Sequence, residues 1–100
     1  MYDPRTNTWT RLADMTTARA SLVAGHSGDK VYAIGGTNGV STSNANEVYD
    51  IPSNSWSPNT AMPTARQEAG VHSHGGRIYV VGGSTPASGA STDANEVFKP

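Results

Sequence analysis

The sequence contains no cysteine, little charge and no long hydrophobic run. Without cysteine the chain has neither disulfides nor thiolate metal ligands. Seven Lys and Arg face eight Asp and Glu, a formal net charge of −1, which argues against a basic nucleic-acid binder. No apolar run approaches the roughly 20 residues that span a bilayer, and Met1 is followed by polar residues without a signal-peptide pattern. We therefore expect no nucleic acid and no membrane as partner, and the sequence carries no targeting signal that would set a localisation.

Large aliphatic side chains are also scarce. Leu, Ile, Val and Phe make up 14 of the 100 residues, whereas Gly, Pro, Ser, Thr and Asn make up 46. Such a composition indicates disorder when the net charge is also high, but here it is close to zero. The chain is therefore either a linker or a protein whose fold needs few large side chains.

An internal repeat favours a folded protein. Tyr2-Asp3 recurs as Tyr49-Asp50, and Trp9 recurs as Trp56, both at an offset of 47 residues. The same offset relates further positions of the two halves: Asn7 and Asn54, Met15 and Met62, Arg19 and Arg66, Gly28 and Gly75, Tyr32 and Tyr79, Gly35-Gly36 and Gly82-Gly83. Beyond the second glycine pair the offset becomes 49, which places two extra residues between Ser84 and Asp93. Low-complexity linkers do not keep such a register, so we expect two repeats, over about residues 2–48 and 49–98.

Each repeat predicts four short β-strands and no helix. Runs of β-branched and aromatic residues at 30–34 and 77–81 end at the glycine pairs and predict the second strands. The other strands are expected as follows: first strands at 21–26 and 68–73, third strands at 46–50 and 95–98, and fourth strands centred on Trp9 and Trp56. Gly28-Asp29 and Gly75-Gly76 supply hairpin turns between the first and second strands. The fold class is therefore all-β, with antiparallel sheets.

The spacing of these residues resembles the kelch motif over the whole chain. A glycine pair, Gly35-Gly36, precedes Tyr49, and six residues separate Tyr49 from Trp56, as six separate Tyr2 from Trp9. The resemblance implies kelch-type β-propeller blades, each a four-stranded antiparallel sheet. It implies structural roles for the following residues: Tyr2, Trp9, Gly35, Gly36, Glu47, Tyr49, Trp56, Gly82, Gly83, Glu96 and Phe98.

The phase of the repeat leaves strands without partners within one chain. The order along the chain is a fourth strand, then strands one to three, then the same again, and Phe98 stands in the register of Tyr2. We expect head-to-tail association in which neighbouring chains complete each other's sheets. A trimer with six blades is the first choice, and a dimer or a tetramer is the alternative. The chain is expected to be a natural fragment or an engineered two-blade unit.

The resemblance also points to a binding face formed by loops. Arg19 and Arg66 stand where family members often place a pocket arginine, and Asn38 and Ser84 lie in the loops beside them. The alternative is that Glu47 and Glu96 hold the two arginines in partly buried ion pairs that link blades.

Catalytic and metal-binding interpretations are weak. The chain lacks a nucleophile elbow, a phosphate loop and a zinc-protease motif, so we expect neither an enzyme nor a cofactor. His72 and His74 share a strand face and are weak metal candidates, with solvated histidines as the alternative. The expected function is a non-catalytic, self-assembling scaffold that presents loops to a protein or peptide ligand. A carbohydrate-handling propeller, similar to the sialic acid mutarotases, is the alternative.

Overall fold

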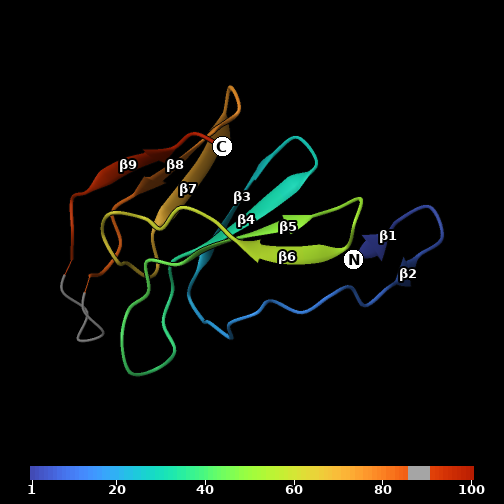
Figure 1. Cartoon of the computed structure of the whole chain (residues 1–100), viewed down its shortest axis with the longest axis horizontal. Helices are drawn as coiled ribbons and strands as arrows, with labels where there is room; N and C mark the ends of the chain where they lie inside the picture. The colour runs from blue at the N-terminus through green and yellow to red at the C-terminus, as the bar shows by residue number, and fades with distance from the viewer. Residues whose placement is uncertain (86–90) are drawn as a thin grey trace.

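Three antiparallel sheets make up the computed structural model, which describes residues 1–85 and 91–100 (Figure 1). A two-stranded ribbon comes first, a four-stranded sheet with strand order β3-β4-β5-β6 follows, and a three-stranded sheet with order β7-β8-β9 comes last. The strands are β1 (Tyr2–Asp3), β2 (Thr8–Trp9), β3 (Val23–Ser27), β4 (Lys30–Ile34), β5 (Asn46–Asp50), β6 (Ser55–Pro58), β7 (Gly70–His74), β8 (Arg77–Val81) and β9 (Asn95–Phe98). The described ranges contain no helix, and hence none that could cross a membrane. The predicted all-β, antiparallel class is confirmed.

The predicted second and third strands have the predicted bounds, but the first strands do not. They were expected to begin at Ser21 and Glu68, and they begin at Val23 and Gly70. Ser21 and Glu68 have φ angles of 55° and 56°, in the left-handed region that interrupts an extended chain. The Glu68 amide donates to the Ser21 carbonyl over 2.9 Å, so the two kinks meet. The expected insertion between Ser84 and Asp93 includes residues 86–90, which lie outside the described residues.

The ribbon repeats the outer half of the four-stranded sheet. Tyr2 pairs with Trp9 in the ribbon, as Tyr49 pairs with Trp56 between β5 and β6. The ring centroids of the two pairs lie 5.1 Å and 5.2 Å apart, at interplanar angles of 47° and 46°. Phe98 of β9 occupies the corresponding place in the three-stranded sheet. Within the described residues, β9 pairs with β8 on one side and with no strand on the other.

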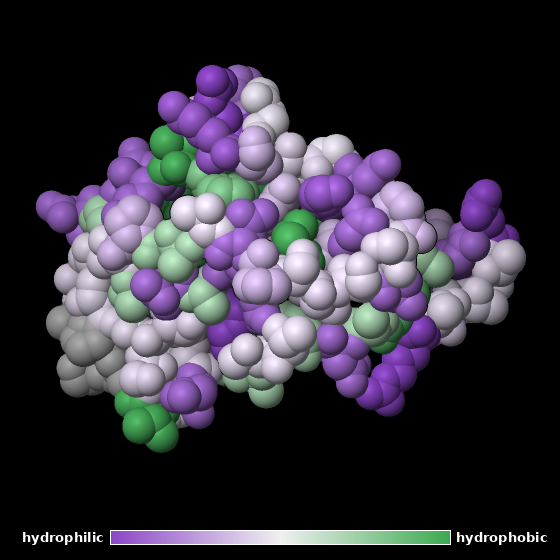
Figure 2. Space-filling model, viewed as in Figure 1, coloured by the Kyte–Doolittle hydropathy of each residue, from purple (hydrophilic) through white to green (hydrophobic). Residues whose placement is uncertain are grey.

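The core lies between the four-stranded and three-stranded sheets, where β3 packs against β7 and β8. Ile78 of β8 is fully buried, and a Cβ atom on Gly25 of β3 would lie 2.8 Å from its Cγ2 atom. The small residue at position 25 therefore lets the two strands approach closely. The buried hydrophobic cluster is small: Tyr32, Ile34, Val48, Met62, Ile78 and Val80. The face shown in Figure 2 is mostly hydrophilic or neutral with scattered apolar spots, in keeping with the scarcity of aliphatic side chains.

Asp50, at the end of β5, should titrate well below an ordinary aspartate. Hydrogen bonds from the Ser53 hydroxyl, from Lys30 and from the Ser53 amide stabilise the carboxylate and lower the pKa of Asp50 to about 2. Because this folded-state pKa lies below the unfolded value of about 4, Asp50 contributes stability that is full above that pH. The contribution is lost as the pH falls through about 2.

A carbon-detected NMR titration of the Asp50 carboxyl group tests this expectation. The variant Ser53→Ala removes the hydroxyl donor, which is the largest cause, and should move the pKa of Asp50 back toward 3.8. An unchanged pKa in that variant would assign the shift to Lys30 and to the Ser53 amide instead.

Candidate functional site

Arg19 lies buried at the end of the four-stranded sheet. Its side chain is 1% exposed and pairs with Glu47, which is 7% exposed, over an Nη2–Oε1 distance of 2.7 Å. The same guanidinium donates to the carbonyl oxygens of Ala33, Gly35 and Ala45 at 3.2, 2.7 and 3.3 Å. Ala33 and Gly35 lie at the end of β4 and Ala45 lies just before β5, so Arg19 supplies donors to backbone acceptors at this end of the sheet.

Arg66 repeats this arrangement and also joins the two larger sheets. Its guanidinium donates to the carbonyl oxygens of Gly82, just after β8, and Ala94, just before β9, both at 3.0 Å. It also donates to Oε1 of Glu96 in β9 at 2.8 Å. Its own carbonyl accepts a hydrogen bond from the amide of Gly36, which follows β4, at 2.8 Å. The backbone of Arg66 is thus tied to the four-stranded sheet while its side chain is tied to the next one.

The ion pairs distinguish a structural role of the two arginines from a role on the binding face. Both guanidinium groups are buried, and their Nη atoms already donate to carbonyl and carboxylate oxygens. The Nε atoms of Arg19 and Arg66 are buried without a partner. A ligand would therefore have to displace Glu47 or Glu96 to reach a guanidinium, and the geometry favours the structural role over a role on the binding face.

The other binding-face candidates lie in the loops that follow the glycine pairs. Asn38 is exposed, and its side-chain oxygen accepts hydrogen bonds from the amides of Val40 and Ser41 at 2.9 and 3.0 Å, which shapes its own loop. Asn38 and Arg19 line one shallow hollow on the surface. Ser84 is half-buried, and its backbone exchanges two hydrogen bonds with Gln67. The structure thus brings Arg19 and Asn38 together and places Ser84 at the base of the corresponding loop of the other repeat.

His72 and His74 lie side by side on β7. Their ring centroids are 6.4 Å apart and the rings are nearly parallel, at 19°. No cluster of three or more His, Cys, Asp or Glu side chains suited to a metal ion occurs in residues 1–85 and 91–100. Two imidazoles fall short of the three or four protein ligands of typical zinc sites, so a metal role for this pair stays a prediction.

A hydrogen-bonded clamp that the sequence did not reveal joins β6 to the segment after the ribbon. Asn54 Oδ1 accepts from the Tyr49 hydroxyl at 2.6 Å and from the Ala13 amide at 3.0 Å. The indole N–H of Trp56 donates to the Ala13 carbonyl at 2.9 Å. The only signal in the sequence is the recurrence of Asn7 as Asn54 between the repeated tyrosine and tryptophan.

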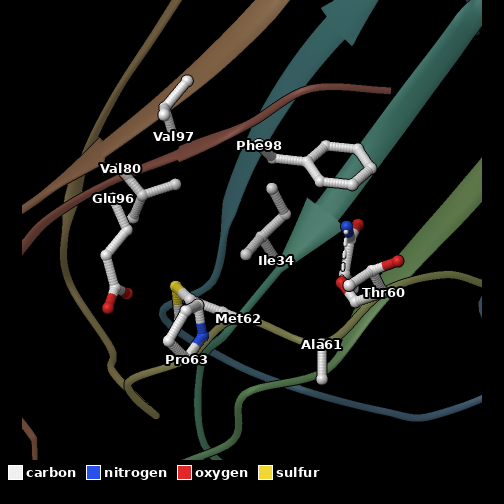
Figure 3. Close-up of a pocket in the computed structure, with 10 residues that line it drawn as sticks. Ile34, Thr60, Ala61, Met62, Pro63, Val80, Glu96, Val97 and Phe98 are labelled. Atoms are coloured by element: carbon white, nitrogen blue, oxygen red, sulfur yellow. Dashed lines mark hydrogen bonds between the residues drawn. The ribbon is translucent and has the colours of Figure 1, made fainter.

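A cavity of about 170 Å³ opens between the two larger sheets. Ile34, Met62 and Phe98 surround it, and Thr60 lies at its edge (Figure 3). Asn46 also lines the cavity and is 4% exposed; its Nδ2 atom donates to the Thr60 carbonyl at 3.0 Å. The Oδ1 atom of the same side chain has no hydrogen-bond partner.

Antiparallel sheets with a repeated arginine–glutamate pair and a repeated tyrosine–tryptophan pair define a β-repeat protein. The family model described as Kelch motif matches residues 1–16, 18–63 and 65–100. These stretches contain the ribbon, the four-stranded sheet and the three-stranded sheet in turn. The chain belongs to the kelch-repeat family.

Curated relatives match about half of the chain. Kelch-like protein 15 of Gallus gallus is 44% identical over 48 residues, which is 48% of this chain and 10% of the relative. Kelch-like protein 25 of Xenopus tropicalis is also 44% identical over 48 residues, 8% of its length. Kelch-like protein 15 of Danio rerio is 40% identical over the same number of residues. The chain thus matches about a tenth or less of the length of these relatives.

Proposed function

We propose that the chain is a non-catalytic kelch scaffold that associates head to tail into a closed β-propeller and presents its loops to a protein partner. The exposure of two valines on the three-stranded sheet supports the proposed self-association. Val81 and Val97 of the three-stranded sheet are 49% and 43% exposed, whereas their repeat counterparts Ile34 and Val48 are 3% and 7% exposed. The three-stranded sheet covers those counterparts within the chain. A further sheet in the same orientation would cover the two valines.

The ribbon can supply the missing strand of the three-stranded sheet. Since Phe98 stands in the register of Tyr49, the fourth strand beside β9 would place a tryptophan opposite Phe98, as Trp56 lies opposite Tyr49. Strand β2 of a second copy carries such a tryptophan, Trp9. Contacts of this kind join different surfaces of the two copies, and they close into a ring when the rotation permits. Two, three or four copies would give four, six or eight blades, all within the usual range of propellers. Three copies are the first choice because kelch propellers most often have six or seven blades, with two or four copies as alternatives.

The loop at 37–44 is the surface that we assign to a protein or peptide partner. Its tip carries Val40, which is 83% exposed, beside the exposed Asn38 and Gly39. An exposed apolar side chain among polar loop residues suits a protein contact better than a sugar site, where aromatic rings are usual. We assign four loops to this face, at 16–21, 37–44, 63–68 and 84–93, and their sequences contain no Trp, Tyr or Phe. The carbohydrate-handling alternative stays a prediction.

The mass of the chain in solution tests the self-association. Sedimentation equilibrium should give about 31 kDa, which corresponds to three copies of 10.4 kDa. Val81→Lys or Val97→Lys should shift the mass toward 10.4 kDa, because the assembly would bury the new charge. Val40→Lys is the matched control, since it introduces the same change on the exposed loop and should leave the mass unchanged. A folded wild-type chain of 10.4 kDa at all concentrations would contradict the assembly.

A further inference from the structure

The backbone of Ala13 is bound by a tryptophan, but the equivalent backbone in the described part of the other repeat is not. Trp56 and Asn54 bind the backbone of Ala13, which lies between the ribbon and the four-stranded sheet. At the repeat offset of 47, the position of Ala13 corresponds to Thr60, between the four-stranded and three-stranded sheets. Within the described residues, no tryptophan donates to the Thr60 carbonyl, which accepts from Asn46 Nδ2 instead.

The surroundings of Thr60 fit an aromatic ring. Thr60 lines the cavity of about 170 Å³ together with the apolar side chains of Ile34, Met62 and Phe98 (Figure 3). Apolar cavities of about 150 Å³ bind benzene. Phe98 occupies the place of Tyr49, whose ring packs 5.2 Å from that of Trp56. A tryptophan ring could therefore contact Phe98 as Trp56 contacts Tyr49.

The cavity also contains an acceptor without a donor. Asn46 Oδ1 is buried and unpaired, and an unpaired buried polar atom is costly. The adjacent Thr60 carbonyl accepts one hydrogen bond from Asn46, and a carbonyl oxygen has a second lone pair. The site thus offers two acceptors to a single N–H group. An indole is an apolar ring with one donor and no acceptor, which matches this combination.

Trp9 is the tryptophan of this chain that could fill the cavity, because Trp56 already binds the backbone of Ala13. It is 80% exposed, whereas its counterpart Trp56 is half-buried. The ribbon that carries it packs on no other strand in the described part of the chain. We propose that the cavity between the two larger sheets receives the indole of Trp9 from a second copy, whose N–H donates to the Thr60 carbonyl or to Asn46 Oδ1. This inference rests on the self-association proposed above and names the site where it is anchored.

The ribbon has to open for this contact to form. Tyr2 occupies the position opposite Trp9 that Phe98 of the other copy would take. Strand β1 of one copy and strand β9 of another therefore compete for the same edge of β2. The Tyr2 hydroxyl strengthens the closed ribbon by donating to Asn7 Oδ1 at 2.6 Å, and Phe98 has no hydroxyl group. Loss of the Tyr2 ring should consequently favour association.

Sedimentation velocity on the intact chain and on three variants tests the proposal. Trp9→Ala should raise the dissociation constant about 30-fold or more, as expected for a buried aromatic anchor. Trp9→Phe keeps a ring but removes the N–H donor, and it should raise the constant about two- to tenfold. Tyr2→Ala should lower it. Because Trp9 and Tyr2 lie in the ribbon, circular dichroism should show intact sheets in all three variants.

A peptide of residues 5–11 distinguishes a failure of the cavity from a failure of the assembly. Added to the Trp9→Ala chain, it should shift the ¹³C signal of the Met62 methyl group, which borders the cavity. The same peptide with alanine in place of tryptophan is the control and should shift nothing. Binding of the tryptophan peptide by a wild-type chain that stays monomeric would support the cavity and contradict the assembly. Association of the Trp9→Ala chain as tight as wild type, with an unmoved Met62 signal, would overturn the cavity and leave strand pairing in place.

Discussion

Replacing Glu47 by glutamine should lower the free energy of unfolding by about 3 kcal/mol, near the lower end of the range for a broken buried ion pair. The carboxylate and the guanidinium of Arg19 are 7% and 1% exposed and lie 2.7 Å apart. Glutamine keeps the shape and one acceptor but leaves the buried cation without a counter-charge. For a domain of this size the melting temperature should fall by roughly 10–20 °C, which differential scanning calorimetry measures directly.

Two further variants show whether the loss of stability in Glu47→Gln comes from the burial of the charges or from the loss of any ion pair. Asp3→Asn breaks the surface pair between Asp3 and Arg5, whose side chains are 25% and 88% exposed, and should cost about 0–1 kcal/mol. The double variant Arg19→Met with Glu47→Leu removes both buried charges and should be more stable than Glu47→Gln alone, because no ion is left unpaired. Equal melting temperatures for Glu47→Gln and Asp3→Asn would show that the buried pair contributes no more than a surface pair.

The repeat explains why this ion pair could be considered from the sequence, as the alternative to a place for the arginines on the binding face. Arg19 and Glu47 recur as Arg66 and Glu96, and a recurring pair of opposite charges has to satisfy the same local geometry twice. The strands at 30–34 and 77–81 were equally predictable, since β-branched and aromatic runs between glycines specify both type and ends. Features that depend on residue type and spacing were therefore within reach of the sequence.

Features that depend on backbone partners were not. The left-handed kinks at Ser21 and Glu68 have no signature in the residue types, and the hydrogen bond between the two kinks joins residues that are 47 positions apart in the sequence. The clamp on Ala13 uses a backbone amide and carbonyl, which every residue except proline possesses. The sequence could show that Asn54 and Trp56 recur, but not which backbone group they bind. The cavity at Thr60 follows from the same packing and was likewise beyond prediction.

Replacing Gly36 by alanine is expected to be as damaging as the loss of the ion pair. Gly36 has a φ angle of +98°, and a Cβ atom at this position would lie 2.6 Å from the Ala20 carbonyl oxygen. That oxygen cannot move away easily, because it accepts a hydrogen bond from the Thr37 amide at 2.9 Å. The backbone strain costs about 1–3 kcal/mol, and the steric overlap adds about 1–3 kcal/mol.

Gly39 provides the matched control, because it has a φ angle of +93° and no atom within 4 Å of the position that a Cβ would take. Urea denaturation should therefore show Gly39→Ala destabilised only by the strain, with Gly36→Ala less stable by a further 1–3 kcal/mol or so. Gly83, the repeat counterpart of Gly36, has a φ angle of +94° and the same 2.6 Å approach, to the Gln67 carbonyl. Gly83→Ala should behave as Gly36→Ala does. In both variants the new methyl group would push apart two backbone segments that are hydrogen-bonded to each other, here those of Gln67 and Ser84. If Gly36→Ala and Gly39→Ala lose equal stability, the second glycine of the pair is required for its φ angle alone, and the close approach of the two segments plays no part.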